Sequence, residues 1–279
     1  MAMNAPEWYE PRSLDEVLDL RAEHGEEATV VAGGSFLGIV MNQKLFAPTM
    51  LVALRSVPDL DYIEADGALL RLGAMTTHRA VERSPLVREG WPSLAFTFSV
   101  VASPRVRNQA TVGGVVADAD YASDPPSMLA ALDARVVARS ARAEREIPME
   151  GFILGHYETA LEEDELVTEL RIPQSGGRSV YRKFRSRSSE DRPCVSVAAV
   201  ESEGGLRVVV GAVAGRPQYL PEICDLARGE RVSGELAAEI GSRYAEEIEP
   251  LSDSRGSARY RRRVIAVEVR RALEDLNRD

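Results

Sequence analysis

Two glycine pairs in this chain could bind a phosphorylated ligand through the backbone. The first lies in the run Ala32-Gly33-Gly34-Ser35, between a β-branched segment and an apolar stretch with helical spacing. A strand that ends in two glycines before a helix exposes backbone N–H groups, which bind phosphate without a basic side chain. A plain tight turn is the alternative interpretation. The spacing matches neither GxGxxG nor GxxxxGK[ST], which excludes Rossmann and P-loop sites.

The second pair lies in Thr111-Val112-Gly113-Gly114, which repeats the pattern of β-branched residues followed by glycines. It falls in a segment from Ser103 to Pro126 that is rich in glycine, proline and short polar residues. We expect this segment to be an ordered, irregular loop, because apolar residues are interleaved through it. Two such turns in one acidic domain indicate a ligand with two phosphates, or a long one.

A carboxylate and a lysine are further candidates. Asp124 precedes two prolines, where an aspartate is commonly a helix N-cap. The functional alternative is a carboxylate that accepts hydrogen bonds from sugar-type hydroxyls. Lys183 lies in the basic run 181–187. Such runs are usually solvated, but this one follows a predicted domain boundary, so a second interpretation has Lys183 pointing into an interdomain cleft.

Composition excludes several classes of protein. The chain has 279 residues, and 34 basic against 44 acidic side chains give a net charge of −10. This length predicts two domains, and the acidic balance argues against a nucleic-acid partner. No stretch approaches the roughly 18 apolar residues of a membrane helix. The first residues lack the layout of a secretory signal, so we expect no membrane span and a cytoplasmic location.

The two cysteines, Cys194 and Cys224, exclude a metal cluster held by this chain alone. An iron–sulfur cluster needs about four thiolates, or two thiolates with two histidines, and the three histidines are far from both cysteines in sequence. We therefore predict no metal site. Motifs of the GxSxG or HExxH type are absent from the sequence, which argues against a hydrolase, and we assign no catalytic residue.

The elements that must position these residues predict an α+β protein. A capping box at Ser13–Glu16 starts a helix that ends at Gly25. Strands at 29–32 and 51–54 flank the helix that follows Gly34, and such a crossover implies a parallel pair. Later elements are a hairpin at 62–73, helices at 76–83, 91–101 and 127–132, and strands at 135–138 and 166–172.

Residues 173–177 form the predicted domain boundary, because proline, serine and glycine gather there. Beyond it we expect a hairpin of strands 195–200 and 206–213, then one helix after Ser233 and another over 257–276. We therefore divide the chain into a larger domain, 1–175, with subdomains at about 1–57 and 58–175, and a smaller domain, 176–279.

Four ordered motifs resemble a known family. They are AGGSFLGIVMNQKLFAPTMLVAL, RLGAMTTHRAVERSPLV, ASPRVRNQATVGG and ASDPPSMLAALDA. They resemble the FAD-binding subunit of molybdenum hydroxylases, most of all the medium subunit of the aerobic carbon monoxide dehydrogenase type, a module also found in xanthine dehydrogenases. The likeness covers nearly the whole chain. It implies an FAD-binding domain of the PCMH or vanillyl-alcohol-oxidase-like type, with two α/β subdomains, followed by a small C-terminal domain of antiparallel sheet plus helices.

The resemblance also implies which residues bind FAD. The first loop, around the pyrophosphate, would be Ala32, Gly33, Gly34, Ser35 and Phe36, and the second loop Thr111, Val112, Gly113, Gly114 and Val115. Asp124 would bond polar atoms of the ribityl chain or the flavin, Lys183 would lie beside the isoalloxazine, and Val167 against its ring.

Four residues depart from the family's pattern. Val115 replaces a usual Asn, and Phe36 a usual Leu. Asp118 and Asp120 stand where Asn and Pro are common. Two extra carboxylates would weaken the binding of a dianionic pyrophosphate if they faced it.

The resemblance implies an oxidoreductase subunit that relays electrons through non-covalently bound FAD. A large subunit with the molybdenum cofactor would oxidise the substrate, a small subunit would hold two [2Fe–2S] clusters, and quinone, NAD or oxygen would accept the electrons. One alternative is an interaction module on the same fold that has lost flavin. Another is a covalent flavin oxidase of the vanillyl-alcohol type, which would need a larger substrate domain and a His or Cys anchor.

Overall fold

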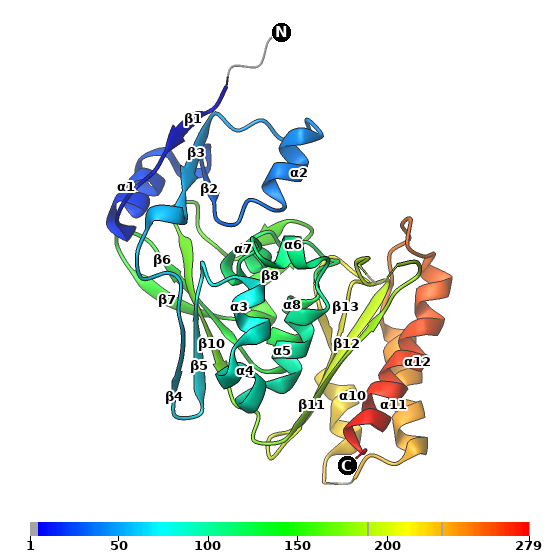
Figure 1. Ribbon diagram of the computed structural model, residues 1–279. Coiled ribbons are helices and arrows are strands. Elements are labelled where there is room, and N and C mark those ends of the chain that lie inside the picture. The colour runs from blue at the N-terminus through cyan, green and yellow to red at the C-terminus, as the bar shows by residue number, and fades with distance from the viewer. Residues whose placement is uncertain (1–4, 189, 230, 279) are drawn as a thin grey trace.

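Three larger β-sheets, each with its own helices, organise the computed structural model, which describes residues 5–188, 190–229 and 231–278 (Figure 1). The mixture of helix and sheet predicted from the sequence is confirmed. The first two sheets and their helices precede residue 174, and the third sheet and the last helices follow it.

The first sheet is small and parallel, with the strand order β1-β3-β2. Its elements are β1 (Glu7–Tyr9), α1 (Leu14–His24), β2 (Ala28–Val31), α2 (Leu37–Asn42) and β3 (Met50–Ala53), with 3-10 turns at Gly25–Glu27 and Leu54–Ser56. The predicted parallel pair is confirmed, since Val30 lies opposite Val52. Ser13 caps α1 through its side chain, as expected, but the Glu16 carboxylate accepts from the N–H of Arg12 (2.7 Å) rather than closing a capping box.

The second sheet is antiparallel, with the order β4-β5-β10-β6-β7. Its strands are β4 (Ile63–Asp66), β5 (Leu69–Gly73), β6 (Arg135–Arg139), β7 (Glu144–Pro148) and β10 (Leu166–Pro173). Between β7 and β10 the chain forms a separate two-stranded sheet of β8 (Ile153–Gly155) and β9 (Glu158–Thr159). Its helices are α3 (His78–Arg83), α4 (Pro85–Gly90), α5 (Pro92–Ser99), α6 (Pro104–Arg107), α7 (Val112–Ala117), α8 (Pro125–Ala131) and α9 (Met149–Phe152). The predicted hairpin is confirmed at Gly67, whose φ is +59°.

The segment 103–126 differs from the irregular loop we predicted, because it contains α6, α7 and the start of α8. Thr111 is the N-cap of α7, and the glycine pair that follows it lies inside the helix rather than in a turn after a strand. The β-branched residues favoured a strand, but the packing of this segment against the body of the domain overrides that local preference. A Cβ on Gly113 would lie only 2.6 Å from the Cβ of Ala74, so glycine permits this close approach.

The third sheet is antiparallel, with the order β11-β12-β13-β14. Its elements are β11 (Arg178–Phe184), β12 (Val195–Ser202), β13 (Gly205–Gly211), β14 (Gln218–Tyr219), α10 (Pro221–Cys224), a 3-10 turn at Asp225–Ala227, α11 (Gly234–Glu247) and α12 (Ala258–Leu276). The predicted hairpin and both C-terminal helices are confirmed. Figure 1 shows α11 and α12 on the outer face of this sheet.

Both faces of β12 are buried, which explains its continuous apolar run. Val195 and Val197 point into a core shared with α11 and α12, whereas Ala198 and Val200 point into the core of the second sheet and its helices. The third sheet therefore packs against the preceding part of the chain through α5 and α8. The domain and subdomain limits at 57, 175 and 176 stay predictions.

Candidate functional site

A cavity of about 840 Å³ gathers most of the residues predicted to bind a cofactor. It is lined by Ala32, Gly33, Gly34, Ser35, Phe36, Thr111, Gly113, Gly114, Val115, Asp124, Val167 and Lys183. Val112 is the exception, because its side chain is fully buried in the core of the second sheet. A volume between about 300 and 1,000 Å³ is typical of cofactor sites.

The two glycine loops meet along one edge of this cavity. A Cβ on Gly33 would lie 1.9 Å from the carbonyl oxygen of Gln109, so the first loop packs directly on the backbone that leads into the second. On the other side, a Cβ on Gly114 would lie 3.9 Å from the Cβ of Ala32. The absence of a side chain at Gly33 thus allows two segments far apart in sequence to form one continuous wall.

The first loop presents free backbone donors to the cavity. Gly34 has a φ of +65°, which turns the chain after β2. Within the described residues, the N–H groups of Gly34, Ser35 and Phe36 donate to no protein acceptor. Consecutive free N–H groups of this kind bind anionic oxygens.

The second loop differs from our prediction, because its backbone donors are already used. The N–H of Val112 donates to the Thr76 carbonyl (2.9 Å), and that of Gly113 to the Ala74 carbonyl (2.8 Å). The N–H of Gly114 donates to Oγ1 of Thr111 (3.2 Å). This loop therefore contributes a rigid, small-residue surface and a hydroxyl, rather than a second set of free N–H groups.

Asp124 and Lys183 form a buried ion pair at the cavity. Nζ of Lys183 lies 2.8 Å from Oδ2 of Asp124 and also donates to the Val100 carbonyl (2.9 Å). The Tyr181 hydroxyl donates to Oδ1 of Asp124 (2.7 Å). Burial raises the pKa of Asp124 and lowers that of Lys183, and each charge opposes the shift in the other. Asp124 is the N-cap residue of α8 by position, as the first interpretation had it, but its side chain makes no capping hydrogen bond and is used by Lys183 and Tyr181 instead.

The residues that depart from the family's pattern all line the cavity. Asp120 is buried and ion-paired with Arg192, and its Oδ1 accepts from the N–H of Ala122 (3.0 Å). Asp118 is half-buried. Burial and the nearby Asp120 raise the pKa of Asp118 to about 7. Both carboxylates therefore face the space that a ligand would fill.

Several cavity residues were not predicted, and three of them bear on the site. Tyr157 comes from the β8–β9 turn, has a φ of +58° and stacks on Phe36 with ring centroids 5.6 Å apart. Arg192 comes from the β11–β12 loop. Neither has a local sequence signal, because each reaches the cavity only through the tertiary fold. The third residue, His78, lies in the helix predicted over 76–83, and nothing in that pattern indicated a place in a binding site.

His78 fastens the second loop. The backbone N–H of His78 donates to the Ala110 carbonyl (2.9 Å), and the ring nitrogen Nε2 lies 3.2 Å from the Thr111 carbonyl. Because Thr111 offers an acceptor, Nε2 carries the proton. Burial lowers the pKa of His78 to about 4, so the ring is neutral at physiological pH.

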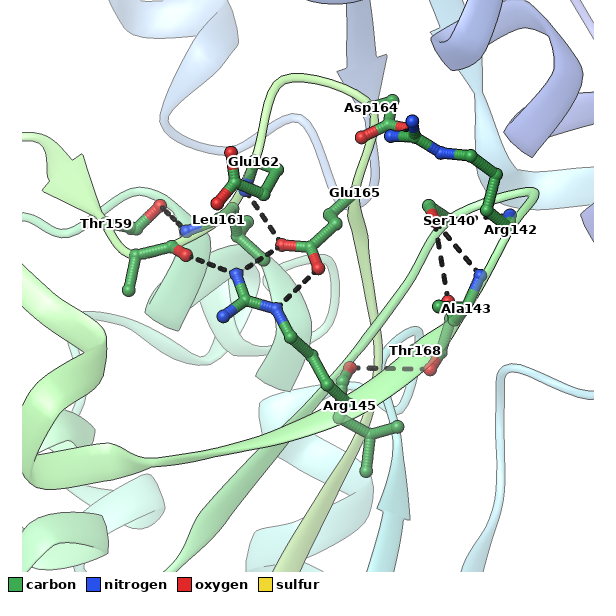
Figure 2. A network of polar contacts seen from close by, with 12 residues as sticks. Ser140, Arg142, Ala143, Arg145, Thr159, Leu161, Glu162, Asp164, Glu165 and Thr168 are labelled. Atoms are coloured by element: carbon green, nitrogen blue, oxygen red, sulfur yellow. Dashed lines mark hydrogen bonds and ion pairs between the residues drawn. The ribbon is translucent and has the colours of Figure 1, made fainter.

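A polar network supports the wall that carries Val167 (Figure 2). Arg145 holds Glu165 through two bonds of 2.6 and 2.8 Å and donates to the Ala160 carbonyl (2.7 Å). Glu165 in turn accepts from the N–H of Glu162 (2.8 Å). Figure 2 shows these groups closing the turn before β10, which fixes the backbone of the residues that enter the cavity.

Two features concern partners and metals. Among the described residues, no helix is long and apolar enough to cross a membrane. In the same ranges, no three His, Cys, Asp or Glu side chains gather in a way that could hold a metal ion.

Comparison with known families covers almost the whole chain. Residues 2–175 match the family described as the FAD binding domain in molybdopterin dehydrogenase, and residues 179–276 match the CO dehydrogenase flavoprotein C-terminal domain. Both matches confirm the resemblance found in the sequence.

Individual relatives agree with these matches. The nicotine 6-hydroxylase medium subunit of Paenarthrobacter nicotinovorans is 32% identical over 98% of this chain and 98% of its own length. The carbon monoxide dehydrogenase medium chain of Hydrogenophaga pseudoflava is 30% identical over 96% and 95%. The crystal structure of quinoline 2-oxidoreductase from Pseudomonas putida 86 superposes with a TM-score of 0.93 at 30% identity, over 99% of this chain and 98% of that one, which confirms the expected fold.

Proposed function

Because this chain belongs to the FAD-binding family of molybdopterin dehydrogenases, as a medium subunit of the molybdenum hydroxylase type, we propose that it relays electrons from partner [2Fe–2S] clusters to a separate acceptor. The observation that supports this proposal is the meeting of both glycine loops, Lys183 and Val167 at one cavity. The family match names the cofactor, FAD, and our proposal adds the path that the electrons take to and from it.

The residues at the cavity fit FAD. The free N–H groups at 34–36 suit a pyrophosphate, which needs several donors on one side. The missing Cβ of Gly33 lets the first loop pack on the Gln109 backbone, which holds the free N–H groups at the edge of the cavity. Apolar side chains such as Val167 and Leu161 provide a surface for a flat ring.

Bound FAD would supply the redox chemistry, taking electrons singly and releasing them in pairs. The protein's residues bind and orient it. In the proposed arrangement Ser35 and the first loop hold the pyrophosphate, and Val167 packs on the ring. The Asp124–Lys183 pair places a fixed, buried dipole at the cavity, where Lys183 keeps one N–H for a ligand.

Partners are required by the electron path that we propose. The sequence has two cysteines, and both are buried, so this chain cannot hold a [2Fe–2S] cluster by itself. We propose that a small subunit with two such clusters and a large subunit with the molybdenum cofactor assemble with it. Quinone, NAD and oxygen are the proposed acceptors, and the cytoplasmic location stays a prediction.

Reconstitution tests this function. The purified chain, stripped of ligand and mixed with FAD, should become yellow with one FAD per chain, and acid should release the flavin unchanged, since no covalent anchor is expected. Flavin retained after acid precipitation would contradict non-covalent binding. A colourless protein that takes up no FAD would instead support the interaction module, for which the carboxylates of Asp118 and Asp120 in the cavity are the structural argument.

A further inference from the structure

Asp118 is a carboxylate of the cavity without a cationic partner in the described part of the chain. Asp118 is half-buried, lines the cavity and is the C-cap residue of α7. Throughout the described ranges, no Lys, Arg or His nitrogen lies within ion-pair distance of its carboxylate, and no donor is hydrogen-bonded to it. The C-terminal end of a helix carries partial negative charge, which further disfavours an anion there.

Three other acids that line the cavity are neutralised by ion pairs. Asp124 is paired with Lys183, Asp120 with Arg192, and Glu165 with Arg145. The charged and titratable groups that face Asp118 are Asp120 on its own loop, Arg192 on the β11–β12 loop and the Tyr157 phenol on the β8–β9 turn. Asp118 is thus a half-buried carboxylate of the cavity whose charge is not neutralised by an ion pair, so a bound anion would meet that charge directly.

We propose that Asp118 takes up a proton from solvent when FAD binds, so that its protonation sets the affinity of the cavity for the cofactor. This inference rests on the proposed function. A dianionic pyrophosphate raises the free energy of a nearby carboxylate, and displacement of water removes its solvation. Both effects favour the neutral acid, and the only bond formed on the protein is the O–H of Asp118.

The expected pH dependence follows from the linkage between binding and protonation. Where Asp118 is already protonated in the free protein, FAD binds without proton uptake and its affinity does not change with pH. Burial and Asp120 bring the pKa of Asp118 to about 7 in the free protein. Above that pH each bound FAD brings up to one proton, and the affinity falls by up to about tenfold per pH unit.

Neighbouring groups do not produce the same signal in this range. His78, with a pKa of about 4, is neutral throughout. Burial raises the pKa of Tyr157, which therefore stays protonated. The buried Asp124–Lys183 pair is another ionisable group at the cavity. A variant of Asp118 separates the proton taken up by Asp118 from a proton taken up elsewhere.

Calorimetric titration of the ligand-free full chain with FAD tests the inference. Titrations run from about pH 6 to about pH 8, in two buffers that differ in ionisation enthalpy, count the protons taken up per FAD. The wild type should take up close to one proton at the alkaline end. Asp118→Asn should take up none and should bind at every pH as tightly as the wild type does at acidic pH.

Asp133→Asn is the matched control, because Asp133 is exposed, lies outside the cavity and has a φ of +56° that Asn tolerates. It should keep the wild-type proton uptake. Binding without proton uptake in the wild type, or uptake that persists in Asp118→Asn, overturns the inference and leaves the proposed function standing. A wild type that binds no FAD at any pH overturns both.

Discussion

Gly33 packs face to face with the backbone of Gln109: a Cβ at position 33 would lie 1.9 Å from that carbonyl oxygen and 2.7 Å from its carbon. This single approach joins a loop of the parallel sheet to the loop that precedes α7. Backbone atoms cannot move aside as a flexible side chain can, so the wall of the cavity depends on the missing Cβ.

Gly33→Ala should therefore separate the two loops. We expect FAD affinity to fall by tenfold or more, because overpacking of this kind costs about 1–3 kcal/mol and 1.4 kcal/mol is about tenfold in affinity. Fluorescence titration of FAD measures it. Gly38→Ala is the control, since nothing lies within 4 Å of a Cβ there, and it should leave affinity unchanged. Equal affinities for the two variants would refute the packing argument.

The effects of replacing Asp124 and Lys183 on the free energy of unfolding should not be additive. Lys183→Met leaves the Asp124 carboxylate buried without a cation, which costs roughly 3–5 kcal/mol. In the double variant Asp124→Asn/Lys183→Met the loss should be smaller, because neither charge remains. Urea unfolding of both proteins measures the difference. A Lys183→Met protein as stable as the wild type would show that the pair does not exist in solution.

His78 should make stability depend on pH in acid. Burial holds its pKa near 4, below the unfolded value of about 6.5, so the unfolded chain binds more protons between these limits. The contribution of His78 is complete above about pH 6.5 and is lost as the pH falls toward 4, by roughly 3 kcal/mol in total.

Unfolding free energies of the wild type and His78→Gln over this range measure the effect, and their difference removes the titration of the carboxylates. The difference in unfolding free energy between the wild type and His78→Gln should become smaller as the pH falls. His24→Gln, which changes a partly exposed histidine, should follow the wild type. A constant gap between wild type and His78→Gln would mean that His78 is not neutral and buried.

The sequence permitted prediction of the parts of the fold that local pattern controls. The parallel pair around Gly33-Gly34, the hairpins at Gly67 and at 203–205, and the two C-terminal helices all follow from spacing and turn residues. The segment around Thr111 was not predicted, because Thr-Val-Gly-Gly reads locally as a strand and turn, and only packing on Ala74 makes it a helix.

The glycine loop at 33–36 could be predicted from the sequence, because its backbone forms that part of the site. Contacts between side chains that are far apart in sequence could not be predicted. The pairing of Asp124 with Lys183 joins residues from both predicted domains, and no spacing reveals it. Tyr157 reaches Phe36 from a turn whose positive φ has no sequence mark. The burial of Val112 follows from the helix that replaces the predicted turn, since a helix rotates that side chain into the core.

The most direct test of the account is a crystal structure of this chain with bound FAD. The account predicts the pyrophosphate oxygens within about 2.7–3.2 Å of the backbone nitrogens of Gly34, Ser35 and Phe36, with the flavin ring in the same cavity beside Val167. A pyrophosphate bound away from this loop, or FAD on another surface of the chain, would contradict it.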